Sequence, residues 1–262
     1  MTSDRDLADR AAAAYAAGAR AHRDFASRGE VDDSGGLLRV ATGSPAPYFS
    51  WLYVVDDDVT AAAVRDAVTW FDARLQPFTS RLRAHQAERY DTTLQDAGLV
   101  PELVMPGMVA DVSSVDGFDV AGLTVDHVAD RPSYDAFTAR VAPGGAHTWL
   151  TTELYRDFLP PSFVDDPAFA MLIGRIDGEP VANAAARVDR GVVTVFAVGT
   201  DNEVRRRGIG RAMTAAAVAW GRDKGADLAF LTSSDMAVPL YESMGFRAVD
   251  TWTFYLRVAG RG

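Results

Sequence analysis

The sequence predicts an α/β protein, and three observations support this prediction. Segments with apolar residues at helical spacing alternate with strand-like runs along the whole chain. Two of these runs, "AFAMLIGRI" and "EPVANAAARV", are joined by the turn "DGE", which is the pattern of a β-hairpin. A third run, "VVTVFAVG", is almost continuously apolar, as expected for a strand at the centre of a sheet that is covered on both faces.

The first half of the chain is expected to begin with a long helix. From Asp4 to Arg28, apolar residues such as Leu7, Ala11 and Tyr15 recur at helical spacing, and Gly29 ends the pattern. The later elements are strands at 37–42 and 48–55, a helix at 60–75, a helix at 87–98 and a strand at 102–112, with the segment 78–84 between the two helices.

The stretch 113–122, "SSVDGFDVAG", is the natural linker, so we expect one domain at 1–115 and another at 120–262. The second half should hold a strand at 123–130, helices at 133–142 and 147–159, the hairpin at 168–188 and the central strand at 192–199. A helix follows, in which Ile209, Met213, Ala217 and Trp220 form one stripe and which Gly225 ends. The last elements are a strand at 226–233, a short helix that contains Tyr241, and a final alternating strand.

Composition excludes several classes of function. The chain of 262 residues has a net charge of −10, which argues against a nucleic acid or an anionic membrane surface as the main partner. It has no cysteine, and its four histidines are scattered, so we expect no metal site and no disulfide. There is neither an apolar run long enough for a membrane span nor the pattern of a signal peptide, so we expect a cytoplasmic protein. The bias towards alanine and arginine indicates a GC-rich bacterial genome.

One stretch of this acidic chain concentrates positive charge. Residues 203–213, "EVRRRGIGRAM", hold four arginines and two glycines, directly between the central strand and the next helix. In this position the helix N-terminus presents unpaired N–H groups and a positive dipole, and the glycines leave room for close approach of an anion. The stretch matches neither the dinucleotide fingerprint nor the P-loop, and a solvated basic turn is the alternative interpretation.

A second segment narrows the interpretation. After the next strand comes "LYESMGF" at 240–246, and together with the R-x-x-G-x-G loop it resembles the GNAT superfamily of N-acetyltransferases. The resemblance covers roughly residues 120 to 258. It implies a mixed, mostly antiparallel sheet flanked by helices, and acetyl-CoA as co-substrate without a metal.

The resemblance also assigns residues. The pyrophosphate of acetyl-CoA would lie on the loop, and the pantetheine arm would pair with the end of the central strand, where Val198 would hold the thioester carbonyl. Tyr241 matches the family tyrosine that protonates the departing thiolate, although it could instead be a packing residue. Ser234 stands where an asparagine often contacts the cofactor, and Asn202 where many members have proline. The cofactor-binding residues implied are Ala197, Val198, Gly199, Thr200, Arg205, Arg206, Arg207, Gly208, Ile209, Gly210, Arg211 and Ser234.

The general base and the acceptor pocket are less well marked. The central strand carries no ionisable residue, so Glu153 and Asp157, four apart on one helix face, are candidates for the base beside an ordered water. Trp149 and Tyr155 are candidates for lining the acceptor pocket. An exposed helix face without a catalytic role is the alternative interpretation of both carboxylates.

The first half resembles a degenerate copy of the second, which predicts two tandem GNAT-like units of which the C-terminal one is complete. "LQDAGL" parallels "YESMGF", so that Gly98 matches Gly245 and Leu94 stands where Tyr241 does. No arginine–glycine loop precedes the helix at Thr60, so the first copy should neither bind CoA nor protonate a thiolate. A chance likeness of helix-to-strand turns is the alternative.

These features predict an acetyl-CoA-dependent N-acetyltransferase that acts on a primary amine of a small molecule or a peptide by direct attack in a ternary complex. A monomer or a homodimer is expected. A non-catalytic acyl-CoA-binding sensor or scaffold is the alternative, because Tyr241 favours an enzyme whereas no base is evident.

Overall fold

A computed structural model describes residues 2–25, 29–141 and 151–257. The chain forms two compact units. Unit one comprises residues 1–14 and 108–249, and unit two comprises residues 15–107 and 250–262. The first and last segments of the chain therefore belong to different units. The expected division into domains at 1–115 and 120–262 stays a prediction.

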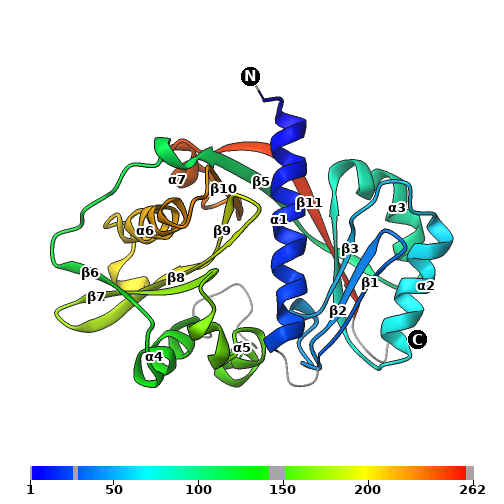
Figure 1. The fold of residues 1–262 in the computed structure, drawn as a ribbon, viewed down its shortest axis with the longest axis horizontal. Helices are drawn as coiled ribbons and strands as arrows, with labels where there is room; N and C mark the ends of the chain where they lie inside the picture. Colours follow the sequence, from blue (N-terminus) through cyan, green and yellow to red (C-terminus); the bar gives the residue numbers. More distant parts are fainter. Residues whose placement is uncertain (1, 26–28, 142–150, 258–262) are drawn as a thin grey trace. The chain divides into compact units, whose positions relative to one another are not determined.

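The elements follow the order that the sequence patterns predict, apart from strands at residues 30–34 and 78–83, which were not predicted (Figure 1). The helices are α1 (Asp4–Phe25), α2 (Ala61–Asp72), α3 (Ala84–Asp96), α4 (Arg131–Val141), α5 (Thr152–Phe158), α6 (Ile209–Asp223) and α7 (Val238–Glu242). The strands are β1 (Glu30–Ser34), β2 (Leu37–Ala41), β3 (Trp51–Val54), β4 (Phe78–Arg83), β5 (Val100–Asp111), β6 (Leu123–His127), β7 (Phe169–Ile176), β8 (Glu179–Asp189), β9 (Val192–Thr200), β10 (Leu228–Thr232) and β11 (Arg247–Arg257). Short 3-10 helices are η1 (Pro47–Phe49), η2 (Val112–Ser114), η3 (Pro161–Asp165) and η4 (Asn202–Val204). None of the described helices is both long and apolar enough to cross a bilayer.

The sheet of unit one runs in the order β10-β9-β8-β7-β6, so β9 is an interior strand as its apolar run predicts. Strands β6 to β9 pair antiparallel, whereas β10 is parallel to β9. The predicted hairpin is present between β7 and β8. Its two turn residues, Asp177 and Gly178, both have positive φ (52° and 83°), which is the geometry of a type I′ turn and matches the twist of the strands.

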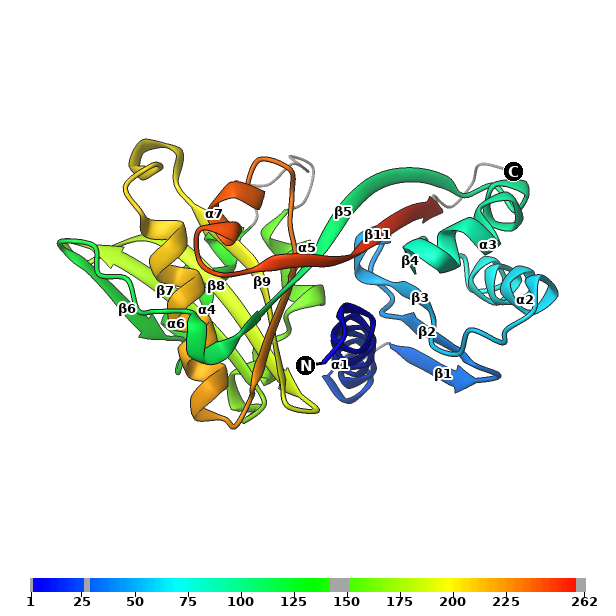
Figure 2. The ribbon, with the colours of Figure 1, turned by 90° about the horizontal axis from the view of Figure 1, so that it is seen from above.

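Helices cover both faces of this sheet (Figures 1 and 2). Helix α6 packs on one face, and α4 and α5 lie on the other. The alternation of β9 follows from this arrangement: Val193 and Val195 are buried in the core that α6 shares, so Thr194 and Phe196 point to the side of α4 and α5. Residues of β9 can therefore serve sites on both faces.

Unit two repeats this order of elements. Strands β1, β2 and β3 pair antiparallel, α2 then crosses over to β4, and β4 is parallel to β3, just as α6 connects the parallel strands β9 and β10. The turns after α3 and α7 are also alike, because Gly98 and Gly245 have φ of 82° and 90°, and the next amide bonds back in the same way, Leu99 N to Leu94 O and Phe246 N to Tyr241 O. The last strand, β11, pairs with β4 through residues 252–257.

Several elements differ from their predicted bounds, and contacts explain two of these differences. The expected strand at 48–55 begins only at Trp51, because Pro47 starts the single 3-10 turn η1 and the indole of Trp51 donates to Tyr48 O at 2.7 Å. Helix α3 begins at Ala84, earlier than the apolar pattern indicates, because Gln86 Oε1 accepts from Arg83 N at 3.2 Å and so caps the helix.

Candidate functional site

The arginine–glycine loop connects β9 to α6. Arg205 Nε donates to Thr200 O at 3.1 Å, which fixes the start of the loop to the end of the strand. Gly208 is the N-cap of α6 in the left-handed conformation (φ 83°), and no side chain caps the helix there. Because the first amides of any α-helix have no partner within the helix, the start of α6 presents N–H groups to a ligand.

The three consecutive arginines of the loop are exposed. Among the described residues, no carboxylate forms an ion pair with Arg205, Arg206 or Arg207. This differs from Arg140, which pairs with Asp201 next to the loop, and from Arg187, which pairs with Asp166. Three exposed cations beside an uncapped helix N-terminus suit a polyanion such as pyrophosphate.

Strand β9 contains a bulge directly before the loop. The register with β8 pairs Asn183 with Gly199 but Ala185 with Phe196, so one residue of β8 lies opposite both Ala197 and Val198. Ala197 has a positive φ of 50°. The side-chain amide of the buried Asn183 donates to Ala197 O, which stabilises this conformation.

The end of β9 is also free of β10. The parallel pairing extends only from Val192 to Thr194, so Ala197 to Thr200 lie beyond it. An extended ligand could therefore add to this edge through backbone hydrogen bonds, in the way that peptides add to sheet edges.

Helix α7 packs on the first turn of α6. A Cβ built on Gly210 would lie 3.7 Å from Leu240 Cδ2, and Arg211 Nη2 donates to Ser243 O at 3.4 Å. The structure therefore brings the loop and the helix that carries Tyr241 together. Ser234 lies at the start of this segment, where its carbonyl accepts from Ala237 N and its side chain is exposed.

Tyr241 is buried between α7 and α6. Burial raises the pKa of its phenol, and a hydrogen bond with the side chain of Thr214 acts in the opposite direction. Thr214 itself donates to Gly210 O at 2.9 Å, so this contact links the phenol to the first turn of α6. With a raised pKa, Tyr241 is protonated at neutral pH and can donate a proton.

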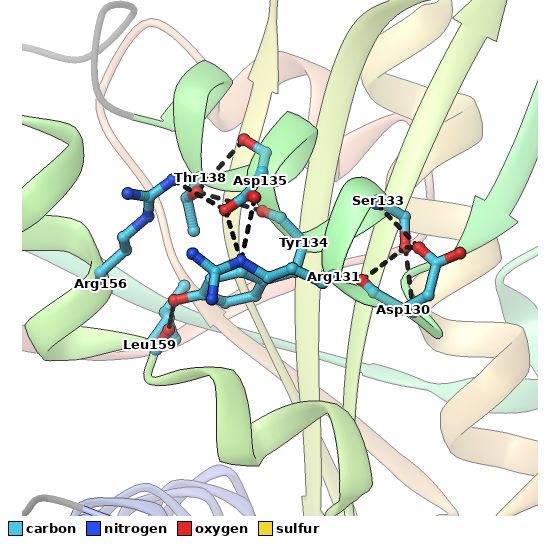
Figure 3. Close-up of polar contacts among 8 residues, drawn as sticks. All are labelled: Asp130, Arg131, Ser133, Tyr134, Asp135, Thr138, Arg156 and Leu159. Carbon is cyan, nitrogen blue, oxygen red and sulfur yellow. Dashed lines mark hydrogen bonds and ion pairs between the residues drawn. The ribbon is translucent and has the colours of Figure 1, made fainter.

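The opposite face of the sheet is organised by a polar network between α4 and α5 (Figure 3). Asp135 accepts from Arg131 Nε at 2.9 Å and from Arg156 Nη2 at 2.8 Å. The hydroxyl of Tyr134 donates to Leu159 O at 2.7 Å. The network therefore fixes α5 against α4.

Aromatic rings connect this region to β9. The ring centroid of Phe196, the residue before the bulge, lies 6.2 Å from that of Phe158 on α5 and 5.8 Å from that of Phe169. Tyr155 on α5 is partly buried, and burial raises its pKa. The side of β9 that faces α4 and α5 is thus bordered by aromatic groups.

The candidates for the general base and for the acceptor pocket have different outcomes. Trp149 lies outside the described residues. Glu153 is exposed in the first turn of α5, where hydrogen bonds from its own backbone amide and from Thr151 lower its pKa, which makes it a weaker base. Asp157 is exposed on the same helix.

Three residues that the structure places around the loop and the bulge were not predicted from the sequence: Asn183, Thr214 and Phe118. Asn183 had a signal, since it is a polar residue within the apolar run "VANAAAR" of β8. Thr214 has no such signal within its helix. Phe118 was assigned to the linker, but its ring packs against Gly208, where an added Cβ would lie 2.5 Å from Phe118 Cε1.

Comparison with known proteins finds a matching family model and similar solved structures. Residues 135–246 match the model of the acetyltransferase (GNAT) family. Among solved structures, a GCN5-related N-acetyltransferase from Kribbella flavida is similar with a TM-score of 0.69 and 24% identity, over 94% of this chain and 96% of that one. A GCN5-related N-acetyltransferase from Sphaerobacter thermophilus has a TM-score of 0.59 and 16% identity, over 96% and 93% of the two chains.

A third similar structure is described as a tandem GNAT protein from the clavulanic acid biosynthesis pathway. It has a TM-score of 0.62 and 13% identity, over 93% of this chain and 88% of that one. At these identities the likeness concerns the fold. A comparison with curated protein sequences finds no match.

Proposed function

Since residues 135–246 carry a domain of the GNAT acetyltransferase family, we propose that the chain transfers an acetyl group from acetyl-CoA to a primary amine of a small molecule or a peptide. The observation that carries this proposal is the uncapped start of α6 beside three exposed arginines. The backbone amides and the guanidinium groups there suit the pyrophosphate of CoA.

The bulged end of β9 suits the other part of acetyl-CoA. The pantetheine arm would add to the edge at Ala197–Thr200, which β10 does not pair. The Val198 N–H would then donate to the thioester carbonyl, where negative charge develops as the amine attacks. Asn183 contributes by holding the Ala197 carbonyl away from this position.

The chemical step needs one proton donor from the protein. The amine forms a C–N bond to the carbonyl carbon, the C–S bond breaks, and CoA leaves as a thiolate. Tyr241, which burial keeps protonated, would supply the proton to the sulfur. The described part of β9 carries no ionisable side chain, so in this proposal the proton of the attacking amine passes to water.

Charge reversal in the loop tests the proposed function. Because Arg206 and Arg207 are exposed, the double change Arg206→Glu and Arg207→Glu should leave the melting temperature unchanged. It should raise the Kd for acetyl-CoA by about 10-fold or more, since two attractive charges become repulsive. Arg222→Glu, at the other end of the same helix, is the matched control and should bind like the wild type.

Activity is measured on the same proteins as release of free CoA with a panel of amines. We expect at least one amine to be acetylated by the wild type and by the Arg222→Glu protein, and to be acetylated poorly by the double variant. Equal acetyl-CoA affinity in the double variant contradicts the assigned loop. Tight binding without turnover on any amine favours an acyl-CoA sensor over an enzyme.

A further inference from the structure

The side chain of Phe118 packs against the arginine–glycine loop, which is proposed to bind pyrophosphate. The residue belongs to the segment between η2 and β6, and its ring packs directly against the Cα of Gly208, as the 2.5 Å and 3.2 Å distances to an added Cβ show. The guanidinium carbon of Arg211 is 4.8 Å from the ring centroid. The ring therefore borders both the N-cap of α6 and the last arginine of the loop.

The ring is exposed as well as held in place. Phe118 is 39% exposed, and in the described part of unit one only Phe118 and Met236 are large apolar side chains with this degree of exposure. Loss of contact with water would favour a ligand that covers this ring. An aromatic face beside a phosphate-binding loop is suited to a nucleobase, because every base can stack on it.

We propose that the exposed face of Phe118 is the stacking platform for the adenine of acetyl-CoA, an inference that rests on the proposed function. The adenosine is attached to the pyrophosphate, so its base must lie near the loop. Arg211 supports the platform, since its guanidinium contacts the ring by a cation–π interaction and adds positive charge for the phosphates. The segment between η2 and β6 thereby takes part in cofactor binding.

Two ligands and two substitutions test the platform. The ligands are acetyl-CoA and S-acetyl-4′-phosphopantetheine, which has the same thioester, the same arm and one phosphate but no adenosine. Phe118→Leu keeps an apolar side chain over Gly208 and removes the stacking face, whereas Phe118→Trp retains an aromatic face. Binding is measured by calorimetry, with Val104→Ala, an exposed apolar site in unit two, as the control.

We expect Phe118→Leu to raise the Kd for acetyl-CoA by about 10-fold and to leave the Kd for S-acetyl-4′-phosphopantetheine unchanged. Phe118→Trp and Val104→Ala should bind both ligands like the wild type. An unchanged Kd for acetyl-CoA in Phe118→Leu, or equal weakening of both ligands, overturns the platform while the proposed function stands. If the wild type binds neither ligand, the proposed function fails and the platform with it.

Discussion

Tyr241 and Leu94 occupy matching positions in the two halves, and their surroundings differ in chemistry. Both are buried, and both accept a backbone hydrogen bond from the residue five positions later, Phe246 and Leu99. Only Tyr241 has a hydroxyl, which reaches Thr214 on the helix that begins at the loop. The same turn therefore presents a proton donor in one half and a methyl group in the other.

Replacing this tyrosine tests whether the phenol is a catalytic acid. Tyr241→Phe keeps the ring and its packing against Phe246, with centroids 5.8 Å apart, so stability and the Kd for acetyl-CoA should change little. The value of kcat should fall by about 10-fold or more, because general-acid catalysis is typically worth about 10²–10⁴-fold. Steady-state kinetics with an accepted amine measures this, and full turnover in the variant would assign Tyr241 to packing.

The raised pKa of Tyr241 also predicts the pH dependence. A group that acts as an acid is lost when pH rises above its pKa, and burial moves the pKa of this phenol above its usual value of about 10. The rate should therefore rise with pH as the amine substrate loses its proton, without a descending limb below about pH 10. A wild-type profile that falls between pH 7 and 9 would contradict Tyr241 as the only acid.

Among the secondary-structure elements, β9 matters most for the proposed site, because its bulge lies where the thioester of acetyl-CoA is proposed to bind. The bulge turns the backbone of Ala197 and Val198 out of register with β8, and Asn183 is the residue that holds it. A Cβ on Gly199 would lie 2.7 Å from Asn183 Oδ1, so the side chain also fills the space beside the strand. We therefore expect Asn183 to position the Val198 N–H.

Asn183→Ala tests this role. Loss of a buried hydrogen bond should lower the free energy of unfolding by about 1–2 kcal/mol, measured by urea denaturation. The value of kcat should fall by about 10-fold or more, because a donor to the developing oxyanion is displaced, while the Kd for acetyl-CoA, set mainly by the loop, changes less. Asn202→Ala, an exposed asparagine in η4, is the matched control. Reduced stability with an unchanged kcat would limit Asn183 to a structural role.

The sequence predicted elements better than it predicted contacts. The helical stripe of α6, the hairpin at Asp177–Gly178 and the interior strand β9 were all visible, because period and turn chemistry are local properties of a chain. The bulge was not, since it depends on a hydrogen bond from Asn183 to a residue fourteen positions away. Phe118 was overlooked for the same reason, as its contact with Gly208 crosses ninety residues.

For the whole molecule, the two halves share an order of elements but start their crossover helices differently. Helix α6 begins at Gly208 without a side-chain cap, whereas the hydroxyl of Thr60 accepts from Ala63 N at the start of α2. Three consecutive aspartates, residues 56–58, precede α2 where arginines precede α6. In unit two, an anion at the start of α2 would therefore lie beside a helix N-terminus that Thr60 caps and beside three negatively charged aspartates.

This difference predicts that one chain binds one acetyl-CoA. Calorimetric titration should give a stoichiometry of one for the wild type, because the start of α6 combines unpaired amides with positive charge, whereas Thr60 caps α2 and aspartates precede it. The double variant Arg206→Glu and Arg207→Glu should bind acetyl-CoA with a Kd raised by about 10-fold or more. Asp57→Asn, which removes a charge before α2, should leave the stoichiometry at one. Two sites in the wild type would show that unit two binds the cofactor despite its capped helix and its aspartates.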